Sequence, residues 1–264
     1  MHKGALILIF AVLAGCLPSP NSEIEGKAVP AIVGGEDVSP TSEIAYSTVA
    51  LMVYFQLDGK VVAKSRCSGV IISPKAILTA AHCFESPENN YTAVRSYVTF
   101  LSDLSHVTKS DSQWVDRIIL KPEYMEGINK EENDIAVVTL YQNIPPSYLP
   151  VKILQDSKLL RLGETAEIAG YGLISMSPPT PSSKLKVAKQ KIAGVYSSTV
   201  ETYLSTDGAP CDGDSGGPAF VRTSEGLRLF GLLWGHLGEG AKECEGRSKF
   251  TRIDFHSSFI APYL

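Results

Sequence analysis

Short apolar runs separated by turn residues recur along most of this chain. The runs are rich in Val, Ile, Leu, Thr and aromatic residues, and Gly, Pro, Asn, Asp and Ser stand between them. Many short runs at this spacing predict an all-β fold of barrels or sandwiches. The expected strands are residues 48–55, 69–73, 97–101, 113–120, 135–141, 165–169, 185–193, 218–222, 227–234 and 249–253. Helical periodicity is confined to the end, where Phe255, Phe259 and Ile260 predict one face of a short helix.

A proline-rich segment divides the expected strands into two series. Residues 141–150 contain three prolines, which exclude a central strand and favour an extended connection. The length of 264 residues accommodates one large domain or two compact halves. We therefore expect one β-unit at residues 32–145 and a second at 146–264.

The first residues have the pattern of an export signal. A short basic start precedes an apolar stretch at 5–13 that is too short to span a bilayer. Leu13-Ala14-Gly15-Cys16 resembles the lipobox of bacterial lipoproteins, in which the cysteine is lipidated and becomes the new N-terminus. We therefore predict a signal peptide at 1–15 and a lipid on Cys16. An ordinary cleaved signal with an unrelated cysteine is the alternative.

Composition limits the possible partners. Pro, Ser, Glu and Asn are frequent after the signal, so residues 16–31 have the character of a flexible tether or pro-segment. The formal net charge is −4 and no basic cluster occurs, so nucleic-acid binding has no support. No apolar run reaches the ~18–20 residues that a spanning helix needs. Membrane contact is expected only through the lipid on Cys16.

The most informative motif is Gly213-Asp214-Ser215-Gly216-Gly217-Pro218. Its glycines allow a sharp turn in which the N–H groups of Gly213 and Ser215 point into one small space. Two donors beside a serine hydroxyl suit acyl transfer, because the hydroxyl attacks a carbonyl and the donors stabilise the resulting oxyanion. A Gly/Pro loop that happens to contain a serine is the structural alternative.

A nucleophilic serine also needs a base and a carboxylate that orients the base. The segment Thr79-Ala80-Ala81-His82-Cys83 offers the base, and Asn133-Asp134-Ile135 offers the carboxylate. Each has a structural alternative: the histidine of a tight turn, and an aspartate that opens an apolar strand. The two motifs precede Ser215 in the order His82, Asp134, Ser215.

This combination resembles the chymotrypsin/trypsin family of serine proteases, whose chain order it is. Ile32-Val33-Gly34-Gly35 resembles that family's mature N-terminus, and the resemblance extends from there to the C-terminus. It implies two packed six-stranded antiparallel barrels with a short C-terminal helix, and a catalytic cleft between the barrels. Together with the lipobox pattern, it suggests a bacterial member of the family.

The chain has five cysteines, an odd number for an exported protein. The resemblance pairs Cys67 with Cys83 and Cys211 with Cys244, which leaves Cys16 for the lipid. A metal site at Cys67, Cys83 and His82 is disfavoured, because the spacing fits no common zinc pattern and an oxidising compartment favours disulfides. We expect no metal and no other cofactor.

The resemblance also assigns catalytic roles. His82 takes the proton of Ser215 and later delivers it to the leaving amine, while Asp134 stabilises the imidazolium. The N–H groups of Gly213 and Ser215 form the oxyanion hole.

A zymogen is a second implication. In the family, the freed ammonium of the N-terminal isoleucine pairs with the aspartate at the position of Asp214, and Ile32 fits the isoleucine. The residue before it is Ala31, which indicates an activating protease that does not cut after Arg or Lys, or self-processing.

Substrate-binding positions follow from the same resemblance. Ala209 falls at the base of the primary pocket, Gly235 at its entrance and Ser248 in its wall, so the pocket carries no charge at its base. Such a pocket favours apolar or medium-sized side chains over Arg and Lys. Asp212 falls at the rim, where a solvated charge is the simpler interpretation.

Leu233 and Trp234 resemble the edge strand that pairs with the substrate backbone. An ordinary apolar strand with a core tryptophan is the alternative. The family usually has serine at the position of Leu233, where the hydroxyl helps to satisfy the catalytic aspartate, so Asp134 must find other donors here.

The sequence therefore predicts an exported serine endopeptidase, extracellular or in the cell envelope, that acts on proteins or peptides. Two other functions remain open. One is a catalytically silent homologue that uses the scaffold for binding, and the other is an esterase with the same triad.

Overall fold

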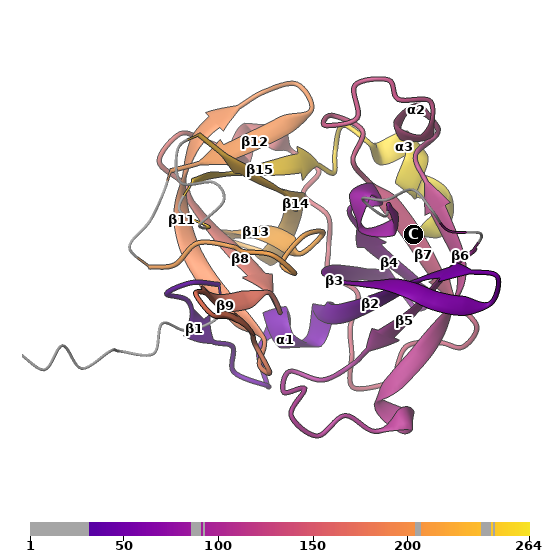
Figure 1. Cartoon of the computed structure of the whole chain (residues 1–264). Helices are drawn as coiled ribbons and strands as arrows, with labels where there is room; N and C mark the ends of the chain where they lie inside the picture. Colours follow the sequence, from indigo (N-terminus) through magenta and orange to yellow (C-terminus); the bar gives the residue numbers. More distant parts are fainter. Residues whose placement is uncertain (1–31, 86–90, 92, 204–206, 239–243, 245) are drawn as a thin grey trace, which may run out of the picture.

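Two closed antiparallel barrels, each of six strands, lie side by side in the computed structural model (Figure 1). The structure describes residues 32–264 except 86–90, 92, 204–206, 239–243 and 245. The predicted signal peptide, the tether, Cys16 and Ala31 lie outside the described residues. The all-β prediction of two packed barrels is confirmed.

The first barrel follows the ring order β2-β3-β4-β7-β6-β5. Its strands are β2 (Thr48–Leu57), β3 (Lys60–Ser73), β4 (Ala76–Thr79), β5 (Ala93–Thr99), β6 (Ser112–Leu120) and β7 (Ala136–Leu140). Val49, Leu51, Val53 and Phe55 alternate along β2 and point into the barrel core. This period of two is what a strand with one buried face requires.

The second barrel closes because β8 pairs with both β11 and β13. Its strands are β8 (Thr165–Gly170), β11 (Lys186–Val195), β12 (Thr199–Thr202), β13 (Pro218–Thr223), β14 (Gly226–Leu237) and β15 (Arg247–Arg252). A two-residue strand, β1 (Glu36–Asp37), extends the sheet beside β11. A separate hairpin joins β9 (Leu173–Met176) to β10 (Pro179–Pro181).

Helices are few and short among the described residues. They are α1 (Glu43–Ser47), α2 (Pro122–Met125) and α3 (Ser257–Ile260), with 3₁₀ turns at Ala81–Phe84, Lys109–Asp111, Ser157–Leu159 and Ala261–Tyr263. Ile260 of α3 is buried and Phe259 packs against the same cluster, whereas Phe255 lies outside the helix and is exposed. The short C-terminal helix is confirmed, but Phe255 does not belong to its buried face.

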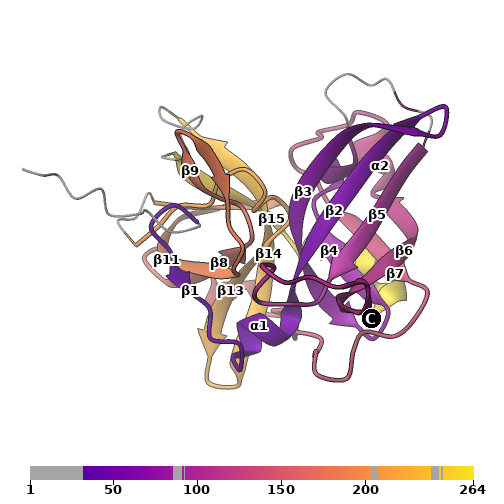
Figure 2. The ribbon, with the colours of Figure 1, turned by 60° about the horizontal axis from the view of Figure 1, so that its bottom comes forward.

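An apolar cluster with residues from both barrels lies between them. Figure 2 shows the two barrels from a second direction. Ala50, Val70 and Ile135 enter it from the first barrel, and Phe220 and Leu232 from the second. Burial of this cluster between the barrels stabilises their contact. The two barrels therefore meet along a shared apolar core.

Strand bounds differ from the sequence prediction mainly where residues are polar or runs are short. Strand β3 begins at Lys60, nine residues earlier than position 69, and its added part contains no buried residue before Cys67. Strand β4 has only four residues, all buried, so no alternation marks it. The proline-rich segment 141–150 contains no strand, and beyond it Ile153 pairs with Leu229 of the second barrel.

Candidate active site

His82 lies in the 3₁₀ turn Ala81–Phe84, directly after β4. The next residue, Cys83, forms a disulfide with Cys67 of β3, as predicted. Ala80, Ala81 and Cys83 are buried, so the turn is fixed against the barrel core while the imidazole is one-third exposed. The disulfide uses both thiols, which excludes the metal site considered from the sequence.

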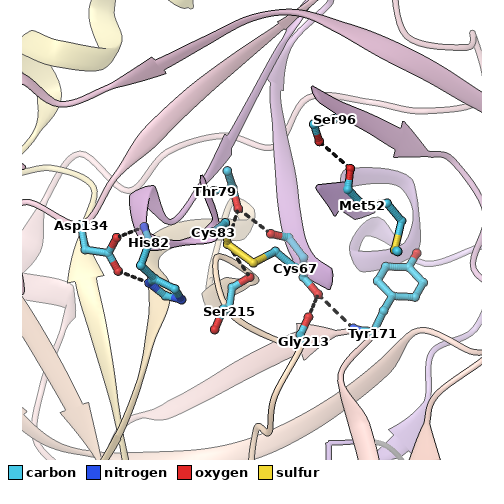
Figure 3. Close-up of a disulfide and its surroundings, with 11 residues drawn as sticks. Met52, Cys67, Thr79, His82, Cys83, Ser96, Asp134, Tyr171, Gly213 and Ser215 are labelled. Carbon is cyan, nitrogen blue, oxygen red and sulfur yellow. Dashed lines mark hydrogen bonds and ion pairs between the residues drawn. A yellow bond between two sulfur atoms is a disulfide. The ribbon is translucent and has the colours of Figure 1, made fainter. Parts of the chain in front are cut away.

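Asp134 holds His82 at two points (Figure 3). Its Oδ1 accepts the backbone N–H of His82 at 2.8 Å, and its Oδ2 lies 2.6 Å from Nδ1 of the imidazole. The carboxylate is fully buried. Burial of the ring favours its neutral form, but the charge and hydrogen bond of Asp134, with a smaller effect of Glu85, prevail and raise the pKa of His82. The pair can hold a proton on Nδ1 and leave Nε2 available as a base.

Ser215 lies in the loop before β13, and Figure 3 shows the His82 ring between Asp134 and this serine. The carbonyl of Ser215 accepts the N–H of Ser68 from β3 at 2.9 Å, so the serine loop of the second barrel is attached to the first. Gly216 has φ of +72°, and a Cβ there would lie 2.1 Å from Thr79 Oγ1. Only glycine allows this approach.

Ser68 also determines how the Gly213 peptide is oriented. Its hydroxyl donates to the Gly213 carbonyl at 3.1 Å and accepts the N–H of Tyr171 at 3.0 Å. Within the described part of the chain, the N–H groups of Gly213 and Ser215 donate to no protein acceptor. The loop therefore presents a serine with two backbone donors, the arrangement expected of an oxyanion hole.

Asp214 is fully buried between these groups. Its carboxylate accepts the N–H groups of Gly172 at 2.7 Å and Cys211 at 2.8 Å, and no cation among the described residues forms an ion pair with it. Burial outweighs these hydrogen bonds and raises the pKa of Asp214 to about 7.

The predicted partner of Asp214 enters the same region. The Ile32 side chain is buried, and Val33 pairs with Ala209, five residues before Asp214 in the chain. The N-terminal segment therefore runs beside the strand-like stretch that leads into the serine loop.

Leu233 and Trp234 lie in the part of β14 next to the serine loop. The Leu233 side chain is buried in the second barrel, while its N–H and C=O bond to Gly217 and Gly216, each at 2.9 Å. These bonds attach β14 to the serine loop. The Trp234 ring is half-buried, with the Lys249 ammonium 4.9 Å from its centroid.

Two of the predicted pocket residues lie on neighbouring strands, Gly235 on β14 and Ser248 on β15. Ala209 is buried, and the Cys211–Cys244 disulfide, also predicted, closes the neighbouring loop. A register shift between Leu233 and Gly235 pairs Gly235 with Lys249 and His236 with Ser248.

Sequence reasoning did not identify His236 as a candidate site residue. A one-residue bulge changes which side chain faces Ser248, and the chain carries no local signal for this bulge.

A cavity of about 350 Å³ opens beside the imidazole. Its lining residues are His82, Tyr124, Lys130, Glu131, Asp134 and Trp234. Glu131 binds Lys249 across the cleft at 2.8 Å, so the rim of this cavity connects the two barrels. A larger cavity of about 850 Å³ lies on the first barrel and includes none of the predicted site residues.

Two further properties of the described residues concern metals and membranes. In the described ranges no group of three or more His, Cys, Asp or Glu side chains is arranged to hold a metal ion. None of the helices in those ranges has the length and apolar character to cross a membrane.

Known proteins resemble most of the chain. The sequence model of the trypsin family matches residues 32–259. Urokinase-type plasminogen activator of Gallus gallus is 27% identical over 218 residues, 74% of this chain and 50% of that protein. Vitamin K-dependent protein C of Oryctolagus cuniculus is 25% identical, over 79% of this chain and 48% of that protein. Chymotrypsin of Phaedon cochleariae is 24% identical, over 92% of this chain and 88% of that protein. The match thus spans about half of the first two relatives.

Proposed function

The chain belongs to the trypsin family of serine proteases, and on this basis we propose that it is a serine endopeptidase with the triad His82, Asp134 and Ser215. The observation that carries the proposal is the doubly held His82, whose ring lies between a buried Asp134 and the Ser215 side chain. A histidine fixed in this way is the base that a serine nucleophile needs.

The proposed reaction divides into two steps. Nε2 of His82 takes the hydroxyl proton while Ser215 Oγ attacks the peptide carbonyl, and the N–H groups of Gly213 and Ser215 stabilise the oxyanion. The C–N bond then breaks, and the imidazolium gives its proton to the leaving amine. Water, activated by the same imidazole, hydrolyses the acyl-enzyme and restores the serine.

Activation by cleavage before Ile32 is the second part of the proposal. Hydrolysis of the Ala31–Ile32 bond would free an ammonium at Ile32, and the buried carboxylate of Asp214 lacks a cation in the described part of the chain. An ion pair between them would compensate the cost of burying that carboxylate. An activating protease, or self-processing, would perform the cut.

Export is the third part. The two disulfides suit an oxidising compartment. The proposed order is a signal peptide at 1–15, a tether at 16–31 with lipid on Cys16, and the protease domain at 32–264. Cleavage before Ile32 would then activate the enzyme and release it from the membrane together.

The experiment is covalent labelling of a chain that begins at Ile32 with a fluorophosphonate. We expect the label on Ser215, and its loss in both Ser215→Ala and His82→Ala, whereas Ser224→Ala at an exposed turn serves as the matched control. Peptide and ester substrates run in parallel separate a protease from an esterase. Absence of labelling in the unaltered chain would favour the silent homologue.

A further inference from the structure

Within the described residues, two neighbouring strands of the second barrel each carry a buried polar atom without a hydrogen-bond partner. The atoms are Nδ1 of His236 in β14 and Oγ of Ser248 in β15. The two residues are direct partners in the antiparallel register, so their side chains project from the same face of the sheet. Ser248 is fully buried. Burial without a partner is costly for a hydroxyl or an imidazole nitrogen, which points to a group that arrives from outside.

These atoms lie next to the segment that leads to Ser215. The imidazole of His236 is close enough to the carbonyls of Pro210 and Gly246, and to the charge of Asp212, for each to act on its ionisation. Strand β14 is bonded to the serine loop at Leu233, three residues before His236. Three residues of a strand span ~10 Å. A substrate side chain next to the bond that Ser215 attacks would reach this place.

The register shift in β14 puts His236 here. Without the shift between Leu233 and Gly235, the residue opposite Ser248 would be Gly235. Because of the bulge, Ser248 faces the imidazole of His236 and not a glycine, which has no side chain. Ala209, which forms part of the neighbouring segment, is buried and contributes no polar side chain. His236 and Ser248 form a polar cross-strand pair on this face.

The chemistry of the two atoms selects a ligand. Burial outweighs the effects of the two carbonyls and of Asp212 and lowers the pKa of His236, so the ring is neutral near pH 7. With the single ring proton on Nε2, the unpartnered Nδ1 is an acceptor. The Ser248 hydroxyl can donate. An acceptor beside a donor matches a carboxamide, whose NH₂ donates and whose oxygen accepts.

We propose that His236 and Ser248 select a glutamine-type carboxamide side chain immediately before the scissile bond. This inference rests on the proposed endopeptidase function and changes the specificity expected from the sequence. An apolar side chain would leave both atoms unpaired, and a lysine or arginine would meet the acceptor without a facing carboxylate at the pocket base. A glutamate would require a proton on His236.

The test uses the chain beginning at Ile32 and four peptides that differ only in the residue before the cut: Gln, Glu, Leu or Arg. At about pH 8, kcat/KM for Gln should exceed that for Leu by ~10-fold or more, since a hydrogen-bonding site rejects analogues that leave it unpaired. In His236→Leu and in Ser248→Ala this ratio should fall to ~1. The controls His106→Leu and Ser224→Ala, both at exposed positions, should keep the original ratio.

Fluorophosphonate labelling of each variant at Ser215 reports whether it is folded and keeps the two proposals apart. Labelling combined with a preference for Leu, Glu or Arg overturns the carboxamide assignment alone. A Gln preference that survives in both His236→Leu and Ser248→Ala overturns it as well. No labelling of the unaltered chain overturns the protease function, and with it the inference.

Discussion

The two walls of the candidate active site differ in how their buried polar groups are satisfied. On the first-barrel side, both carboxylate oxygens of Asp134 are occupied by His82, through its backbone N–H and its ring. On the second-barrel side, Asp214 has two backbone donors and no cation in the described residues, and Ser248 Oγ and His236 Nδ1 have no partner. Asp134, Asp214 and Ser248 are all buried, so what distinguishes them is whether they have partners.

On the first-barrel side, folding itself provides the partners of the buried polar groups. On the second-barrel side, the partners must come from a cleavage or from a bound substrate. A buried charge with its hydrogen bonds made contributes to a stable, preorganised site, whereas an unpaired one costs free energy until a partner binds. Under the proposals above, the His82–Asp134 pair of the first wall forms as soon as the chain folds. The buried polar groups of the second wall gain their partners only when the ammonium of Ile32 is freed and a substrate side chain binds.

The largest expected effect comes from removing the Asp134 carboxylate, which holds His82 on the first-barrel side. In Asp134→Asn the amide cannot hold the imidazole in the required tautomer, so kcat/KM should fall on the order of 10⁴-fold. Steady-state hydrolysis of a peptide substrate measures this. Asp116→Asn, an exposed aspartate of the same barrel, is the control. A loss smaller than tenfold would mean that His82 does not depend on this carboxylate.

The next effect concerns the incomplete wall in the chain before cleavage. Folding raises the pKa of Asp214 from 3.8 to about 7, so the folded state keeps a proton that the unfolded state has lost, and stability falls as the pH rises from about 4 to about 7. Between pH 4 and pH 8 the effect of Asp214→Asn on the stability of the uncleaved protein should become more favourable by about 4 kcal/mol, because the amide removes the buried charge. Urea unfolding at both pH values measures the difference.

Cleavage before Ile32 should reverse the sign of this effect. The new ammonium then pairs with Asp214, so the same substitution removes the pair and lowers both stability and activity. Equal effects of Asp214→Asn before and after cleavage would contradict the pairing.

A smaller effect tests the contact between the walls at Ser68. In Ser68→Ala the Gly213 carbonyl and the Tyr171 N–H lose their hydrogen-bond partner, so we expect a loss of ~1–3 kcal/mol in stability and a lower kcat. Ser96→Ala is the matched control, because Ser96 is also buried and bonds only the Met52 carbonyl. It should lose stability and keep kcat. An identical kcat in both variants would argue that Ser68 only packs.

The smallest effect concerns the Glu131–Lys249 pair, which crosses the cleft in front of Trp234. Glu131 is 61% exposed, so solvent screens the pair, and Lys249→Gln should cost less than ~1 kcal/mol even with the loss of the ring contact. Thermal unfolding at low and high salt measures it. A cost well above this value, insensitive to salt, would identify the pair as a structural link between the walls.

Much of the fold was predictable because its signals are local. The alternation along β2, the glycines around Ser215 and the prolines of 141–150 each constrain a few neighbouring residues. The two disulfides followed from the family resemblance and are confirmed. Strand β4 and the polar part of β3 were missed, because a fully buried strand and an exposed one both lack alternation.

The sequence by itself determined the all-β class, the two-barrel division and the motifs that bring His82, Asp134 and Ser215 under consideration. Only the tertiary structure decided that, among the described residues, His82 supplies the hydrogen bonds of Asp134, and that Leu233, which the resemblance aligns with the family's serine, is buried in the barrel core. It also decided that His236 rather than Gly235 faces Ser248. The physical reason is that pairing and register depend on contacts between residues far apart in the chain, and a single bulge changes which side chains share a face.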